Sequence, residues 1–182
     1  MLEATEDKAL AALAGEGDRA AFARLVDRHY GRIFGLSWRL MRNRAEAEDL
    51  AQDVCVLLAR RIGSYRGEAA FTTWLYRLVL NAARDRARAG AARARAHDGF
   101  AEVDDLRRGE EAARGREAEW LREAIAGLGP EMRETAVLVL DEGLTHDEAA
   151  AVLEVAPSTV SWRLMEMRKA LKRLAETAGG PG

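Results

Sequence analysis

Arginine and aromatic side chains gather in one stretch of this sequence, around a short loop that contains glycine. Between Arg60 and Arg95 the chain holds nine arginines against two acidic residues. Arginine neutralises phosphates, aromatic rings stack on bases, and loop backbone groups can hydrogen-bond an extruded base. These residue types in this order predict a site for single-stranded nucleic acid. The group comprises Tyr65, Arg66, Glu68, Thr73, Trp74, Arg77, Asn81, Arg84 and Arg88.

Two plainer interpretations of this stretch stay open. The arginines could form only the solvated face of a helix, since the chain is rich in alanine and arginine. The rings of Phe71 and Trp74 could belong to the core, which fits Phe71 fully and Trp74 in part.

A second candidate surface lies on the helix expected from Pro157 onward. Its apolar residues recur at spacings of three and four and predict a buried stripe, formed by Val160, Leu164, Met167, Leu171 and Leu174. The opposite face holds Trp162, Met165, Glu166, Lys169 and Arg173, with Ser161 and Arg163 at its flanks. Exposed tryptophan and methionine usually mark a contact surface, and the local excess of cations can neutralise phosphates. A helical hairpin that packs or dimerises without touching DNA is the alternative.

A third candidate surface belongs to the helix expected between Asn43 and Arg61. Its core stripe comprises Leu50, Val54, Leu57 and Leu58, and its second face Asp49, Gln52, Asp53, Val56 and Arg60. An acidic face with an apolar residue at its centre suits docking onto a partner helix. A solvated acidic face is the commoner explanation of such a pattern.

Enzymatic, metal-binding and membrane functions find no support in the residues. We expect no catalytic residue, no metal site and no cofactor, because no nucleophile–base constellation, phosphate loop or metal-ligand spacing occurs. Cys55 cannot form an internal disulfide, and His29, His97 and His146 are expected at the surface or at helix caps. No apolar run reaches the about 20 residues of a membrane span, and Met1–Leu10 lacks the pattern of a signal peptide. We expect a soluble cytoplasmic protein without membrane insertion.

Apolar spacing of three or four throughout predicts an all-α fold of two helical domains joined by a flexible linker. In the first domain, residues 1–88, Asp18 caps a helix to about His29, and Gly31–Met41 forms the next. Asn43 and Glu46 form a capping box for a long helix to about Arg61. After the loop at residues 63–68, a helix is expected from Phe71 to about Arg88.

The second half of the chain begins with the linker. Residues 89–116 carry no apolar stripe and predict this linker, and residues 177–182 predict a disordered tail. Between them, residues 117–176 form the second domain, with a helix from near Glu117 and another over Pro130–Glu142. Thr145 to Glu148 is a capping box before a short helix, a turn at residues 154–156 and the long helix from Pro157. This order is a helix-turn-helix.

Two sets of motifs, in this order, resemble the extracytoplasmic function (ECF) sigma factors of the sigma-70 family. Residues 49–53 (DLAQD), 65–68 (YRGE), 71–77 (FTTWLYR) and Asn81 are similar to region two of that family. Residues 143–150, 158–160 and 163–164 are similar to region four. The resemblance covers about residues 20–88 and 120–174, with the expected linker between them.

This resemblance implies an initiation factor that binds core RNA polymerase and promoter DNA and has no catalytic activity. Region two would dock on polymerase through Asp49, Gln52, Asp53 and Val56. It would melt the −10 element and hold its single strand through Tyr65, Arg66, Gly67, Glu68, Thr72, Trp74, Arg77, Asn81, Arg84 and Arg88. Region four would read the double-stranded −35 element through Ser158, Thr159, Ser161, Trp162, Arg163, Met165, Glu166 and Lys169. The resemblance also implies control by a cognate anti-sigma factor.

The recognition helix departs from the family pattern. Glu154 stands where the family usually has glycine, and a left-handed conformation there would cost about 1 kcal/mol. Ser161 and Glu166 stand where the family commonly has basic residues, and Trp162 replaces a small polar one. These departures predict an atypical −35 preference or weak −35 binding.

Two other classes of protein remain as alternatives. A sigma-mimicking protein could sequester an anti-sigma factor without engaging promoters, and the altered recognition helix favours it. The retained loop at residues 65–68 and the arginines of the following helix argue against it. A stand-alone helix-turn-helix repressor leaves the first domain unexplained.

Overall fold

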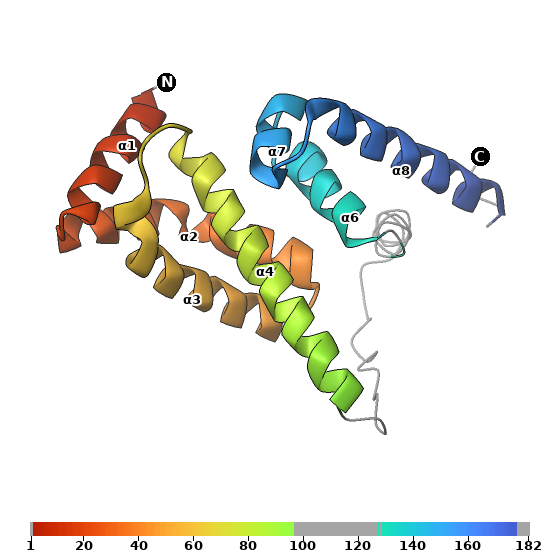
Figure 1. Ribbon diagram of the computed structural model, residues 1–182, viewed down its shortest axis with the longest axis horizontal. Coiled ribbons are helices and arrows are strands. Elements are labelled where there is room, and N and C mark those ends of the chain that lie inside the picture. Colours follow the sequence, from red (N-terminus) through yellow and green to blue (C-terminus); the bar gives the residue numbers. More distant parts are fainter. Residues whose placement is uncertain (1, 97–126, 128, 178–182) are drawn as a thin grey trace, which may run out of the picture. The chain divides into compact units, whose positions relative to one another are not determined.

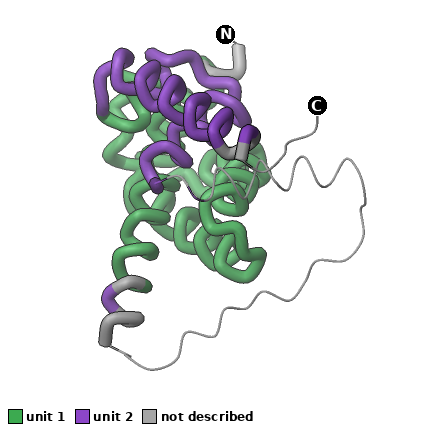
Figure 2. The backbone as a smooth tube through the Cα atoms, turned by 90° about the vertical axis from the view of Figure 1, so that its right-hand side faces the viewer, with its two compact units in different colours: residues 1–90, 151–154 green, residues 91–150, 155–182 purple. Residues whose placement is uncertain are grey.

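The structure is a computed structural model that describes residues 2–96, 127 and 129–177. The described part is all-helical (Figure 1). The chain divides into two compact units, one of residues 1–90 with 151–154 and one of residues 91–150 with 155–182 (Figure 2).

The first unit contains the helices α1 (Leu2–Gly15), α2 (Arg19–Met41) and α3 (Arg44–Arg61). A 3-10 turn, η1 (Ile62–Ser64), leads into a loop, and α4 (Phe71–Ala96) follows. The core of the unit is mostly aliphatic and also holds the aromatic rings of Phe71, Tyr76 and His29. It is formed by Leu25, Ile33, Leu36, Leu50, Val54, Leu58, Phe71, Leu75 and Val79. This core fixes the loop of residues 65–70 between α3 and α4, where the sequence places its candidate nucleic-acid site.

Local capping signals in the sequence are confirmed at two helix starts. The Asp18 carboxylate accepts from the backbone N–H groups of Ala20 and Ala21, at 2.8 and 3.1 Å. The Asn43 side chain accepts from the Glu46 N–H at 3.1 Å, which opens α3 at Arg44. Such caps satisfy N–H groups that the helix leaves unpaired.

Three helices of the first unit differ from the sequence prediction. Helix α1 was not predicted, because its inner face is built largely of small residues such as Ala11 and Ala14. Helix α2 runs through Gly31 without a break, since burial along its inner face outweighs the cost of about 1 kcal/mol for a helical glycine. Helix α4 continues past Arg88 to Ala96, because alanine and arginine extend an existing helix well.

The second unit contains α6 (Pro130–Ala136), a π-helical turn η2 (Val137–Asp141), the first part of α7 (His146–Leu153) and α8 (Pro157–Thr177), whereas residues 151–154 group with the first unit. The predicted helix over Pro130–Glu142 is thus helical to Asp141, with its last turn widened. Gly143, at φ +69°, ends it. The buried residues of the second unit include Leu138, Ala149, Val160, Leu164 and Met167, and the last three belong to the apolar stripe predicted from the sequence.

The capping box of the helix-turn-helix is confirmed by a reciprocal pair of bonds. The Thr145 N–H donates to the Glu148 carboxylate at 2.8 Å, and the Glu148 N–H donates to the Thr145 hydroxyl at 3.3 Å. Hydrogen bonds from the backbone and hydroxyl of Thr145 lower the pKa of Glu148. The helix predicted from Glu117, the linker from residue 97 on and the tail from residue 178 lie outside the described residues.

Candidate nucleic-acid interface

The loop between α3 and α4 has a defined shape. The Tyr65 hydroxyl donates to the Ala69 carbonyl at 2.7 Å, which closes residues 65–69 into a turn. Gly67 adopts φ +69°, a conformation that favours glycine. Arg66 and Glu68, on either side of it, are exposed. The loop therefore presents one cation and one carboxylate around a fixed glycine.

Aromatic rings support this loop from beneath. Tyr65 packs edge-on against Phe71, with ring centroids 5.6 Å apart, and lies 5.7 Å from the Trp74 ring. Phe71 is buried, whereas Tyr65 and Trp74 are partly buried. Phe71 is thus a core residue, and Trp74 lies at the border of the core with part of its ring accessible.

His29 lies in the core beneath the same rings. The expectation of a surface or capping position is wrong, because only 2% of the residue is exposed and its ring lies 5.1 Å from Phe71. The ring Nε2 donates to the Asp7 carboxylate at 2.9 Å. Burial lowers the pKa of His29, although the neighbouring Asp7 carboxylate acts to raise it. Four-residue spacing from Leu25 was the signal for this buried position.

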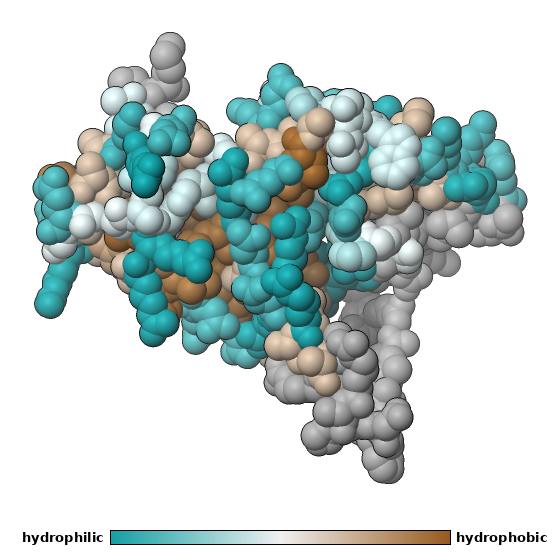
Figure 3. Space-filling model, viewed as in Figure 1, coloured by the Kyte–Doolittle hydropathy of each residue, from teal (hydrophilic) through white to brown (hydrophobic). Residues whose placement is uncertain are grey.

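The outer side of α4 carries the polar side chains expected for a nucleic-acid contact. Asn81 and Arg88 are exposed, whereas Thr72, Arg77 and Arg84 are partly buried. Arg88 is paired with Asp85 one turn earlier. Hydrophilic side chains cover much of α4, with apolar atoms visible between them (Figure 3).

The predicted docking face of α3 is accessible. Asp49, Gln52 and Asp53 are exposed, and Val56 is 50% exposed. Arg86 of α4 bridges the two carboxylates, with its guanidinium nitrogens 2.9 Å from Asp49 and 3.2 Å from Asp53. Sequence reasoning missed Arg86, because nothing in its own helix distinguishes it from neighbouring arginines.

In the second unit, most predicted contact residues lie on the open side of α8. Trp162 is 53% exposed and Met165 44%, and Ser158 and Lys169 are also exposed. Thr159 and Glu166 are partly buried.

Three polar residues of this surface already have partners. Lys169 pairs with Glu166 at 2.9 Å, so the carboxylate offsets one cation of the surface. The exposed Ser161 hydroxyl donates to the Pro157 carbonyl at 3.2 Å and lies 3.0 Å from the His146 Nδ1. The Ser161 hydroxyl thereby links the starts of α7 and α8.

Arg163 does not lie on the outer face of α8. Only 8% of the residue is exposed, and its guanidinium pairs with Glu131 and lies 3.5 Å from the Thr135 hydroxyl. The expected outward position is wrong, because partners on α6 compensate the buried charge. Arg163 therefore joins α8 to α6.

Glu154 in the turn before α8 adopts φ +59°. The left-handed conformation considered from the sequence is thus present at a residue with a side chain. The Val155 N–H donates to the Ala150 carbonyl at 3.1 Å and closes the end of α7. The turn geometry is kept at the cost of backbone strain.

Residues 2–96, 127 and 129–177 contain neither a cluster of metal ligands nor a helix suited to a membrane. Within this part of the chain, no three histidine, cysteine or acidic residues come together in a way that could hold a metal ion. Over the same residues, no helix is both long and apolar enough to cross a membrane.

Comparison with known proteins shows which family this chain resembles. The family described as Sigma-70 region 2 matches residues 25–93. The ECF RNA polymerase sigma factor SigM of Mycobacterium tuberculosis is 34% identical over 87% of this chain and 79% of its own. The ECF RNA polymerase sigma-E factor of Haemophilus influenzae is 30% identical over 94% of this chain and 96% of its own.

A solved structure extends the similarity to the fold. CnrH, in complex with the cytosolic domain of CnrY, is 28% identical to this chain, with a TM-score of 0.68. The match covers 94% of this chain and 98% of CnrH. With relatives of this identity over nearly its whole length and region two at residues 25–93, the chain belongs to the ECF sigma factors of the sigma-70 family, the non-catalytic subunits of transcription initiation.

Proposed function

We propose that this sigma factor docks on core RNA polymerase through α3, opens the −10 element with the loop and α4, and reads the −35 element with α8. The observation that carries the proposal is the arrangement of residues 44–90. Within one compact unit, the acidic face of α3 is followed by a loop that packs on aromatic rings and then by the cationic helix α4.

The loop and α4 have the chemistry to hold a single strand. Tyr65 and Trp74 offer partly accessible rings on which bases can stack. Glu68 and the loop backbone offer hydrogen-bonding groups for an extruded base. The arginines Arg77 and Arg84 can neutralise the phosphates of that strand.

The α3 face has the chemistry to bind a cationic partner helix. Asp49 and Asp53 supply two carboxylates one turn apart, and Gln52 and Val56 supply an amide and an apolar contact. Charges at such a surface steer association and fix its register, while an exposed Val56 gives apolar contact. Arg86 holds both carboxylates and orients them.

Recognition by α8 is expected to be atypical. Trp162 can contact a thymine methyl group, and Glu166 can accept from a cytosine amino group. Arg163 serves in this proposal as a positioning residue, since its guanidinium is buried on α6. A panel of −35 base substitutions that gives the usual family preference at normal affinity would contradict this part.

Control by an anti-sigma factor is the remaining part of the proposal. CnrH was solved in complex with the cytosolic domain of CnrY, and this chain matches 98% of CnrH. The exposed Val56 and Trp162 are apolar groups that such an inhibitor would cover. We place the activity in the cytoplasm, where polymerase and promoter DNA are found.

Run-off transcription with purified core polymerase tests the function. The amino-acid sequence does not specify which promoter the protein uses. The template is therefore a pool of DNA molecules with randomised −35 and −10 elements. The 5′ ends of the transcripts are sequenced. We expect transcripts with a shared upstream sequence only when this protein is added. No transcripts, together with tight binding to an anti-sigma domain, would favour the sequestering alternative.

A further inference from the structure

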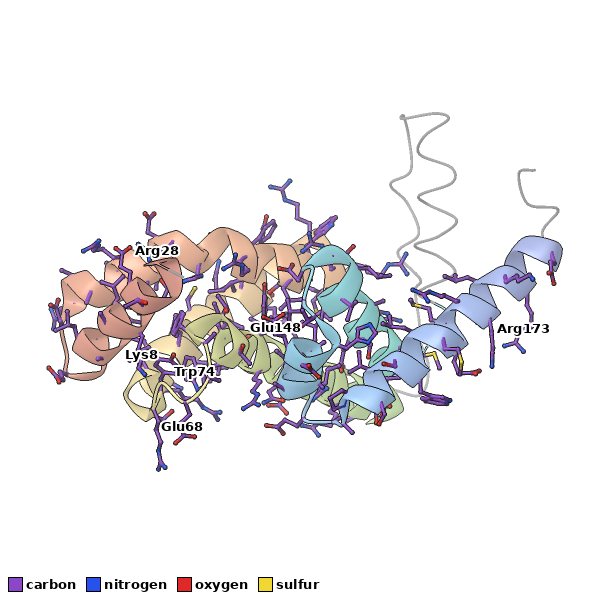
Figure 4. All side chains as sticks on the ribbon, turned by 90° about the horizontal axis from the view of Figure 1, so that it is seen from above. Lys8, Arg28, Glu68, Trp74, Glu148 and Arg173 are labelled. Atoms are coloured by element: carbon purple, nitrogen blue, oxygen red, sulfur yellow. The ribbon has the colours of Figure 1, made fainter. Side chains whose placement is uncertain are left out.

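Helix α1 contacts the segment that links α3 to α4 at two points. Near the start of the segment, Gly15 lies against η1, so that a Cβ at Gly15 would come within 3.3 Å of the Gly63 Cα. In the loop that follows, the Lys8 ammonium donates to the Gly67 carbonyl at 3.1 Å. Lys8, Glu68 and Trp74 lie at the same end of the unit (Figure 4). The N-terminal helix therefore braces the proposed −10 loop.

The rotation of α1 that directs the exposed Lys8 toward the loop is fixed by the two residues before it. Asp7 is 3% exposed, and its carboxylate lies 2.9 Å from the His29 Nε2 and 2.8 Å from the Arg28 guanidinium. Glu6 pairs with Arg28 at 2.8 Å. These bonds fix the rotation of α1 on α2, so the next residue along the chain is directed toward the loop.

Lys8 also occupies the space that a side chain at position 67 would need. A Cβ built on Gly67 would lie 2.5 Å from the Lys8 Cε and 3.0 Å from its Nζ. The lysine stem thus packs directly against the Gly67 backbone while its ammonium binds the Gly67 carbonyl. A side chain at position 67 and a lysine bound in this way exclude each other.

We propose that Lys8 is a positioning residue for promoter recognition, which acts by holding the Gly67 carbonyl and thereby the loop that presents Arg66 and Glu68. This inference rests on the proposed function of the loop at the −10 element. A fixed loop discriminates between bases better than a mobile one, because its hydrogen-bonding groups are already oriented. Lys8 thus acts through loop geometry, and we expect it to affect base preference.

A direct phosphate contact by Lys8 would give a different result. Loss of a phosphate contact weakens binding about uniformly across sequences and reduces the salt dependence by about one unit of slope. Loss of a positioning residue lowers the preference for the favoured base and leaves the slope unchanged. Base preference and salt slope therefore separate the two roles.

The test uses holoenzyme assembled from the full chain and core polymerase. Its affinity is measured for fluorescent single-stranded oligonucleotides that carry the −10 sequence from the run-off pool and each substitution of its most selective base. Lys8→Met keeps the apolar stem without the ammonium, and Lys8→Arg restores a cationic donor. Arg44→Ala, which removes an exposed cation paired with Glu48, is the control for lost charge.

We expect Lys8→Met to reduce the preference for the favoured base about five-fold, with an unchanged salt slope and unchanged core binding. Lys8→Arg should recover part of the preference, and Arg44→Ala should keep all of it. A uniform loss of affinity with a reduced salt slope, or an unchanged preference, overturns the role of Lys8. A wild-type holoenzyme without any preference at the −10 element overturns the proposed function, and the role of Lys8 with it.

A double-mutant cycle with Gly67→Ala gives a second readout. The added methyl group would displace the Lys8 side chain and break its bond to the carbonyl, and alanine is also strained at the φ of +69° found there. We therefore expect Lys8→Met to have no further effect on base preference once Gly67→Ala is present. Additive losses would show that Lys8 and Gly67 act independently and would overturn the proposal. Core binding of each variant reports that the unit is folded.

Discussion

At the scale of single residues, the turn before α8 combines a conformation and a side chain that do not suit each other. Glu154 adopts φ +59°, where a Cβ is strained and glycine is not. The surrounding hydrogen bond from the Val155 N–H to the Ala150 carbonyl holds the turn in this shape. The strain is local, so one substitution tests it.

We expect Glu154→Gly to raise the free energy of unfolding of the protein by up to about 1 kcal/mol. Urea denaturation followed by circular dichroism measures the change. Ala156→Gly, two residues further on at ordinary φ, is the control and should not stabilise the protein. Equal stability of Glu154→Gly and the wild type would mean that the turn is not strained.

His29 makes the stability of the first unit depend on pH. Burial lowers its pKa, helped by Arg32 and Arg28 and opposed by Asp7. The unfolded chain, with an ordinary histidine pKa near 6.5, then binds a proton before the folded chain does. The contribution of neutral His29 to the free energy of unfolding is therefore fully present above about pH 6.5. It decreases as the pH falls below that value.

We expect the His29→Gln variant to lack the part of the unfolding free energy that depends on pH through His29. Thermal unfolding of both proteins between about pH 8 and pH 5.5 measures it, and the difference between them should shrink as the pH falls. A constant difference would show that His29 binds protons equally in both states.

At the scale of elements, the proposed function assigns the −10 strand to α4 and core polymerase to α3. We expect Arg77→Ala combined with Arg84→Ala to slow open-complex formation at least about ten-fold, because two phosphate contacts are lost. Stopped-flow fluorescence of a labelled promoter measures the rate, and core binding should stay intact. Unchanged melting would contradict the assignment of α4 to the −10 strand.

The opposite pattern is expected on α3. Asp49→Ala combined with Asp53→Ala should weaken core association about ten-fold or more, since two steering carboxylates are removed. Competition with a labelled sigma factor for core polymerase measures this, and binding of single-stranded −10 DNA at saturating core should persist. Glu46→Ala, at the start of the same helix, controls for lost acidic charge. Unaltered competition by the double variant would remove α3 from the interface.

The elements also show what the sequence could and could not predict. Capping residues such as Asp18, Asn43 and Thr145 act within a few residues, so the sequence located these helix starts. The pairing of Asp7 with His29 spans 22 residues and that of Lys8 with Gly67 spans 59. Such contacts depend on how helices pack, which apolar spacing does not specify.

The candidate site shows the same division. The exposed face of α3 was predicted by its helical spacing, because the faces of one helix follow from the order of its residues. Arg86 was missed because only packing brings it to Asp49 and Asp53. Arg163 was misplaced because its partner Glu131 lies on another helix.

At the scale of the whole molecule, charge is separated along the chain. The protein has a formal net charge of −2, yet residues 60–95 are strongly basic and α8 carries a second group of cations. In the proposed function, such a separated distribution attracts DNA to the basic surfaces without making the whole protein bind polyanions. It also agrees with two modules that contact one promoter at separate elements.

Permanganate reactivity of thymines in the −10 element tests the central proposal most directly. The promoter is taken from the sequenced transcripts, and core polymerase alone is the control. With this protein added, we expect unpaired, reactive thymines in that element. A holoenzyme that assembles and occupies the promoter while every thymine there stays protected would contradict the proposal that α4 and its loop open the strands.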